Sequence, residues 1–221
     1  MSRSLSQRAA FGRKIGLKDS DARKLARLKS PADVQDFISS LRMNYEKGGD
    51  TCRSATMALA RGEAHCIEAA FIAAAALWMM GYPPLLMDMQ AKGDHDHVIC
   101  IFRERGRWGA ISKSNHVWLR WRDPVYKTPR ELAMSYFHEY TKGRKKTLRN
   151  YSVPFKLRRY KDNEWVSGRE DCWDIACALD EGRHFPLFTV AQGRSLRPRD
   201  AMEMKADKLT QYKKKRKKAG K

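Results

Sequence analysis

The apolar positions of the chain first indicate helices. Ser30 and Pro31 form a good helix start, since serine caps the free N–H groups and proline fits the first turn. Val34, Phe37, Ile38 and Leu41 then repeat with the spacing of one helical face. A short second helix is expected over residues 56–60, before Arg61-Gly62.

Residues 64–80 are apolar on every side and end at Gly81, a residue that commonly stops a helix. A helix without a polar face lies in the middle of a domain, because no side of it favours water. Its alanines allow neighbouring elements to approach closely. We therefore predict one buried helix at the centre of the fold.

After Pro83-Pro84 the pattern changes to strands. Apolar runs over residues 85–89, 98–102 and 108–111 predict three strands, and alternation at Val117, Leu119 and Trp121 predicts a shorter fourth. Tight turns between these runs favour antiparallel pairing.

More helices are expected toward the C-terminus. Thr128-Pro129-Arg130-Glu131 is a capping box that opens a helix, and residues 170–179 form a further helix candidate, whereas residues 143–163 are basic and loop-like. The order of elements predicts an α+β fold, with a buried helix packed on an antiparallel sheet and extra C-terminal helices.

Charge divides the 221-residue chain. Lys and Arg number 45 against 25 Asp and Glu, a formal net charge of +20. Residues 1–30 carry a net +7 and residues 205–221 a net +8. We expect a basic N-terminal arm (1–29), a core (30–141), a helical extension packed on it (142–204) and a disordered Lys-rich tail (205–221). Basic ends of this kind attract nucleic acid or an anionic surface. A disordered, solvated tail that binds nothing would explain the charge of residues 205–221 equally well.

Several protein classes are excluded. No apolar run reaches the length of a transmembrane helix, and the first residues lack the apolar core of a secretory signal, although residues 1–18 loosely resemble a transit peptide. Five cysteines without a C-x-x-C pair argue against a disulfide framework or a zinc ribbon. We expect a cytoplasmic protein with neither a cofactor nor a bound metal.

The candidate chemistry centres on Cys66, in the first turn of the buried helix. The free N–H groups and dipole of a helix start favour a thiolate, and can also stabilise an oxyanion. His97 follows thirty-one residues later, at the start of a buried strand, where an imidazole can act as general base. A polar residue after the return strand, within Ser112–Asn115, would orient that imidazole.

Simpler explanations exist for each residue. A cysteine in an apolar helix is most often a small core residue. The alternation Asp94-His95-Asp96-His97 fits a solvated loop, and it also offers ligands for a divalent metal, although the sequence contains no second ligand cluster.

The combined pattern resembles a known family. Gly62-Glu63-Ala64-His65-Cys66 opens an alanine-rich helix that ends in Gly81-Tyr82-Pro83. A strand follows, then His97-Val98-Ile99-Cys100-Ile101 and Gly106-Arg107-Trp108. This order over about residues 30–140 resembles the transglutaminase-like core of the papain-like cysteine peptidase superfamily. The resemblance implies that Cys66 is the nucleophile and His97 the base.

The third catalytic position departs from the family, whose acid stands where this chain has Ser112. Asn115 is our preferred orienting residue, since some papain-like enzymes use asparagine, and Ser112 is the direct positional match. Asp123 is a further candidate. Asn or Ser can hold an imidazole but cannot stabilise an imidazolium by charge, which puts activity in question.

Three further residues near Cys66 or resembling it are not assigned to the catalytic site. Adjacent helical residues point about 100° apart, so we expect His65 to be a poor base for Cys66. Glu68 is expected to pair with an arginine such as Arg53, and Cys52, in a loop, is a weaker nucleophile candidate.

Two functions follow. The first is a transglutaminase-like cysteine hydrolase or acyltransferase that acts on an amide or ester of a protein or peptide through a thioester. The second is a catalytically weak or inactive relative that binds nucleic acid or a ribonucleoprotein through its basic arms.

Overall fold

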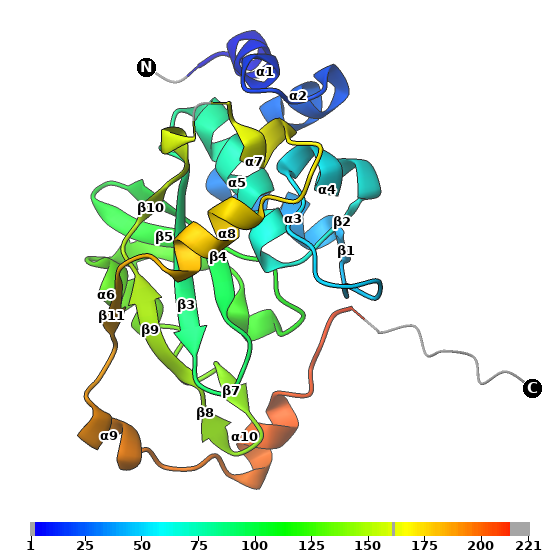
Figure 1. The fold of residues 1–221 in the computed structure, drawn as a ribbon. Coiled ribbons are helices and arrows are strands. Elements are labelled where there is room, and N and C mark those ends of the chain that lie inside the picture. Colours follow the sequence, from blue (N-terminus) through cyan, green and yellow to red (C-terminus); the bar gives the residue numbers. More distant parts are fainter. Residues whose placement is uncertain (1–2, 161, 213–221) are drawn as a thin grey trace, which may run out of the picture.

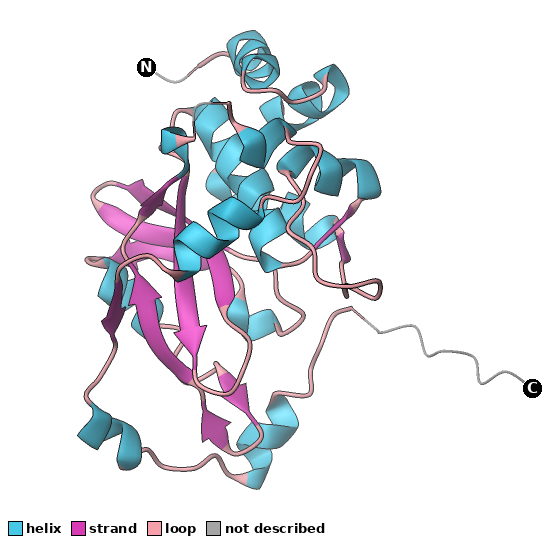
Figure 2. Ribbon diagram, in the orientation of Figure 1, coloured by secondary structure: helices cyan, strands magenta, loops and turns pink. Residues whose placement is uncertain are grey.

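The computed structural model describes residues 3–160 and 162–212, which form an α+β fold built on an antiparallel sheet (Figures 1 and 2). The helices are α1 (Leu5–Lys14), α2 (Asp19–Ala26), α3 (Pro31–Ser40), α4 (Ala55–Arg61), α5 (Cys66–Met80), α6 (Pro129–Met134), α7 (Glu164–Ser167), α8 (Trp173–Asp180), α9 (Val190–Arg194) and α10 (Ala201–Ala206). The strands are β1 (Arg42–Met43), β2 (Glu63–Ala64), β3 (Leu85–Ala91), β4 (His97–Glu104), β5 (Arg107–Ile111), β6 (Arg122–Tyr126), β7 (Thr141–Lys142), β8 (Lys145–Lys146), β9 (Leu148–Ser152), β10 (Phe155–Lys156) and β11 (His184–Pro186). The main sheet has the order β11-β9-β3-β4-β5-β6, and β10 pairs with the start of β3.

The predicted buried helix is α5, which lies in the interior between the other helices and the sheet (Figure 1). Its alanines pack in one cluster with Leu86, Cys100 and Phe102 from one face of the sheet. The helix ends at Gly81, whose φ of 108° is costly for any residue with a Cβ atom. Burial of apolar surface on all sides of α5 therefore fixes the position of its first residue, Cys66.

The opposite face of the sheet packs on α6 and the segment after it. Met87, Ile99 and Ile101 alternate with the residues that face α5, and they contact a second cluster that contains Tyr136 and Tyr140. Because successive strand residues point to opposite faces, one sheet serves two cores.

The strands β4 and β5 form a tight hairpin. Arg105 and Gly106 both have positive φ, 46° and 77°, as a two-residue turn that matches the twist of the strands requires. The hairpin aligns the first residue of β4, His97, with the segment that follows β5. The start of one strand and the end of its partner thus meet at one edge of the sheet.

The predicted fourth strand over residues 117–121 is wrong. Val117–Leu119 form a 3₁₀ turn, and the fourth strand, β6, begins at Arg122. Leu119 is buried, whereas Val117 and Trp121 are only partly buried, because the segment turns before the strand begins. Pro124 lies within β6, which is tolerated because β6 is an edge strand.

The basic segment 143–163 is not a loop, and the extension 142–204 is not wholly helical. β9 pairs with β3, β11 pairs with β9, and β10 also pairs with β3. Leu148 is fully buried in β9. The many lysines and arginines of this segment hide its strand pattern, and the sheet therefore extends beyond the expected core boundary at residue 141.

The expected N-terminal arm also folds. The helices α1 and α2 pack on the domain (Figure 1) through small and apolar side chains, including Ala9, Ala22 and Leu25, while most of their lysines and arginines are exposed. The charge excess is one face of an amphipathic pair rather than a free arm.

The expected tail, 205–221, is ordered in its first part. The structure describes it to Tyr212, whose backbone N–H donates to the side-chain oxygen of Asn115 at 2.8 Å. Thr210 forms an antiparallel bridge with His116. Residues 213–221, which contain the run of six basic residues, lie outside the described residues.

Within residues 3–160 and 162–212, no helix combines the length and the apolar character that crossing a bilayer requires.

Candidate active site

The first residue of α5 is Cys66, and its side chain is partly exposed to a cleft of about 740 Å³. The N–H groups of Cys66 and Ile67 have no partner within the helix, because they belong to its first turn. Burial opposes ionisation of the thiol, but hydrogen bonds from His65 and His97, and their charges, outweigh it. The pKa of Cys66 therefore lies well below that of an ordinary cysteine.

His97 is the first residue of β4 and is 7% exposed. Its Nε2 lies 2.6 Å from the hydroxyl oxygen of Ser112, which directly follows β5. The structure brings together Cys66, His97 and Ser112, because the β4–β5 hairpin sets the last two side by side where α5 begins.

The hydrogen bonds of Ser112 determine which nitrogen of His97 carries the proton. The single hydroxyl hydrogen of Ser112 is donated to the carbonyl oxygen of Leu119 at 2.9 Å. The hydroxyl oxygen must then accept from His97, so Nε2 of the imidazole is protonated. Nδ1 is then the unprotonated nitrogen of the neutral ring. This is the tautomer that a general base for the thiol needs.

The preferred orienting residue, Asn115, does not hold His97. Its amide nitrogen donates to Tyr45 at 3.2 Å, and its oxygen accepts from the backbone of Tyr212. Asp123 lies exposed on the edge strand β6. The positional match, Ser112, is the residue whose hydroxyl contacts His97.

His65 contacts Cys66 directly, contrary to the expectation from helical geometry. Its Nδ1 lies 3.8 Å from the sulfur, and its Nε2 lies 2.7 Å from the carbonyl oxygen of Thr51. His65 is the N-cap, with extended backbone angles, so the 100° rule for helical neighbours does not apply. Burial lowers its pKa, but Cys66, Glu68 and Glu46 outweigh this and raise it to about 9.

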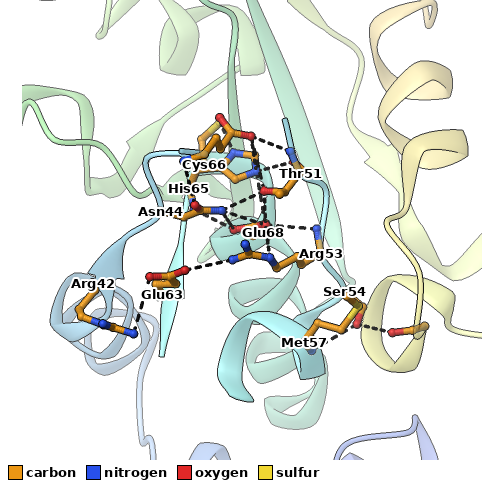
Figure 3. A network of polar contacts seen from close by, with 12 residues as sticks. Arg42, Asn44, Thr51, Arg53, Ser54, Met57, Glu63, His65, Cys66 and Glu68 are labelled. Atoms are coloured by element: carbon orange, nitrogen blue, oxygen red, sulfur yellow. Dashed lines mark hydrogen bonds and ion pairs between the residues drawn. The ribbon is translucent and has the colours of Figure 1, made fainter. Parts of the chain in front are cut away.

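Glu68 is a fully buried carboxylate beneath the site (Figure 3). It accepts hydrogen bonds from the Thr51 hydroxyl at 2.9 Å and the His65 backbone at 3.0 Å, and it pairs with Arg53 at 3.8 Å, as expected. Asn44 also donates to it at 3.1 Å. A buried charge needs this number of partners. Glu68 thus fixes the loop over residues 44–53 to the start of α5.

The sequence did not identify two buried polar residues that lie behind Ser112. Gln35, on α3, accepts from the backbone N–H of Ser112 at 2.9 Å and donates to its carbonyl oxygen at 3.0 Å. Lys113 is 1% exposed, and its ammonium donates to the carbonyl oxygens of Ile38 and Leu41 and to the hydroxyl of Tyr212. Burial, with a smaller contribution from the charge of a nearby arginine, lowers the pKa of Lys113 to about 7.

The remaining cysteines have other surroundings. Cys52 is fully buried and donates its S–H to the carbonyl oxygen of Cys172 at 3.4 Å. Burial raises the pKa of Cys52, Cys100 and Cys172. Cys177 is exposed on α8. Cys66 is therefore the thiol with the strongest thiolate character among the five.

Carboxylates approach one another beside β3. Oxygen atoms of Asp88, Asp96 and Asp180 lie within 4.8 Å of one another, an arrangement that could hold a metal ion. Asp88 contacts Nε2 of His184 at 3.0 Å. Burial and the charge of Asp96 raise the pKa of Asp88 to about 7, although His184 opposes this. Of the run from Asp94 to His97 that offered metal ligands in the sequence, Asp96 is the member that joins this group among the described residues.

Comparison of the chain with models of protein families and with curated proteins gives no match.

Proposed function

We propose that this protein is a cysteine-dependent hydrolase or acyltransferase with a transglutaminase-like, papain-like core. The observation that carries the proposal is the cleft that Cys66, at a buried helix start, shares with His97, whose imidazole Ser112 holds in the required tautomer. The order of cysteine helix and histidine strand gives independent support through its resemblance to that family.

In the first step, the Cys66 thiolate attacks the carbonyl carbon of an amide or ester. The carbonyl π electrons move to oxygen, and the free N–H groups of the α5 start stabilise that oxyanion. When the oxyanion collapses, the bond to the leaving group breaks. Protonated His97 gives its Nδ1 proton to the leaving amine or alcohol, and a thioester remains on Cys66.

In the second step, water or an amine attacks the thioester carbonyl. Neutral His97 takes the proton of the attacking group on Nδ1, and the sulfur leaves as a thiolate. Ser112 accepts from Nε2–H throughout, so the ring keeps its orientation while it gains and loses a proton. Water gives hydrolysis, and an amine gives acyl transfer.

The test is Cys66-dependent turnover of an activated ester such as p-nitrophenyl acetate. Cys66→Ser is expected to abolish the turnover, and Cys177→Ser to leave it unchanged, because Cys177 is exposed and does not line the cleft. Equal loss in both variants, or turnover that survives Cys66→Ser, would refute the proposal.

Binding of nucleic acid or a ribonucleoprotein through basic arms stays a prediction. The folded N-terminal helices weaken its original basis, since the basic side chains of α1 and α2 belong to a packed pair of helices.

A further inference from the structure

The lining of the cleft carries the opposite charge to the chain as a whole. Among the described residues, six carboxylates line the cleft, against a single lysine and no arginine. The carboxylates are Glu46, Asp50, Asp94, Asp96, Glu139 and Asp207. The whole chain has 45 Lys and Arg and 25 Asp and Glu, so acidic residues are enriched in the cleft lining relative to the whole chain.

Part of this negative charge is balanced locally. Glu46 lies 3.6 Å from His65, and Asp207 pairs with His116 and Arg199, both at 3.3 Å. Among the described residues, the other four lining carboxylates, Asp50, Asp94, Asp96 and Glu139, form no ion pair with a basic side chain. Four carboxylates around the cleft are therefore available to a ligand.

The lysine of the lining does not cancel them. Lys113 is buried, and its three N–H groups already donate to two carbonyl oxygens and the Tyr212 hydroxyl. The partly exposed sulfur of Cys66 shares the same cleft. A group that reaches this sulfur therefore passes through a negative potential, which low-dielectric walls strengthen.

We infer that the acyl substrate is a peptide segment rich in lysine or arginine, whose cationic side chains bind the cleft carboxylates while a carbonyl approaches Cys66. This inference rests on the proposed function, since it names the substrate class of the same thiol. Acidic peptides are excluded by the same charges that attract basic ones.

Charged thiol reagents test the potential at Cys66 without a known substrate. Methanethiosulfonates with a trimethylammonium or a sulfonate group both form a mixed disulfide and release methanesulfinate. Cys177 is the internal reference thiol. We expect the ratio of cationic to anionic rates to be about tenfold higher at Cys66 than at Cys177, and to fall with added salt.

Matched variants assign the effect to the cleft. Asp50→Asn with Glu139→Gln is expected to reduce the ratio by about twofold per carboxylate. Asp36→Asn with Asp162→Asn removes the same charge from exposed positions outside the cleft lining and should leave the ratio unchanged. If both double variants lower it equally, overall charge is responsible and the inference fails.

Peptide acyloxymethyl ketones that carry lysine or glutamate beside the reactive ketone complete the test. Faster labelling of Cys66 by the lysine peptide supports the inference. If Cys66 reacts readily with neutral iodoacetamide but shows no preference between the peptides, the substrate class is wrong and the proposed function stands. If Cys66 fails to react even with iodoacetamide, both are overturned.

Discussion

Gln35 binds the backbone of Ser112 at both of its polar groups, with bonds of 2.9 Å to its N–H and 3.0 Å to its carbonyl oxygen. The two residues lie 77 positions apart, and both are buried. Because these bonds use only the backbone of Ser112, its hydroxyl can donate to the carbonyl oxygen of Leu119 and accept from His97. Gln35 is thus a positioning residue, which acts on His97 through Ser112.

Replacement of Gln35 by alanine should destabilise the protein by about 2 kcal/mol, because it leaves a buried N–H and a buried C=O without partners. Urea unfolding measures this loss. Below pH 7, alkylation of Cys66 should also slow, since His97 loses its fixed orientation. Asp36→Ala, at an exposed neighbouring position on α3, is the control. A stability loss with an unchanged alkylation profile would show that Gln35 is merely structural.

Removal of the Ser112 hydroxyl separates the two candidates for the third position. Ser112→Ala should lower ester turnover by about tenfold or more, since His97 loses the acceptor for Nε2–H. Asn115→Ala should leave turnover within about twofold, because Asn115 contacts Tyr45 and Tyr212 instead. Steady-state kinetics with p-nitrophenyl acetate provides the measurement, and a reversed order of the two variants would contradict the geometry.

The lowered pKa of Cys66 predicts a distinctive pH profile. A cysteine thiol in a model peptide loses about tenfold in alkylation rate per pH unit below its pKa of about 8.5. Cys177, exposed on α8, is the cysteine for comparison. Because the pKa of Cys66 is lowered, more of its thiolate remains at those pH values, so its rate should fall much less than that of Cys177 between pH 8 and 6. Peptide mapping after brief iodoacetamide treatment distinguishes the sites. Parallel profiles for the two cysteines would contradict the assigned ion pair.

The two imidazoles beside Cys66 should have separable roles. His65→Asn keeps a good helix cap but removes one cation, so the pKa of Cys66 should rise while ester turnover continues at higher pH. His97→Ala should abolish turnover at every pH, because no group remains to move the proton. His95→Ala, at an exposed position, is the control for the second variant. Turnover that survives in His97→Ala would point to His65 as the base.

Two glutamates that share Arg53 differ in burial, and this predicts different costs. Glu68→Gln should destabilise the protein by about 3 kcal/mol, because it leaves Arg53 and several donors without a buried anion. Glu63→Gln should cost less than about 1 kcal/mol, since Glu63 is partly exposed and lies 3.4 Å from Arg53. Thermal and urea unfolding of both variants would reveal equal costs if burial did not matter.

Local patterns predict the parts of the site that local structure creates. The buried helix with Cys66 at its start follows from an apolar run between polar residues and Gly81, and His97 follows from the start of an apolar strand. Both positions hold in the structure. The contact of His65 with Cys66 depends on the extended backbone of a cap residue, which a helical wheel does not represent.

Contacts between distant segments could not be predicted in this way. Nothing in the surroundings of Gln35 marks it as the partner of Ser112, because a lone glutamine on a helix is usually solvated. Charge also obscured folded structure in residues 5–26 and 145–156, where lysines and arginines cover the outer face of packed elements. Net charge describes a surface, and it does not distinguish a free arm from an amphipathic helix.

Tyr212 has a consequence for biosynthesis. Its hydroxyl accepts from Lys113 and donates to the carbonyl oxygen of Ser39, a residue 173 positions earlier. On the ribosome, the nascent chain exposes Cys66 and His97 well before residue 212 emerges, since synthesis proceeds at about 5–20 residues per second. During that interval the Lys113 ammonium lacks one of its acceptors, and the wall behind Ser112 is incomplete. The reactive thiol should therefore mature only after residue 212 has left the exit tunnel.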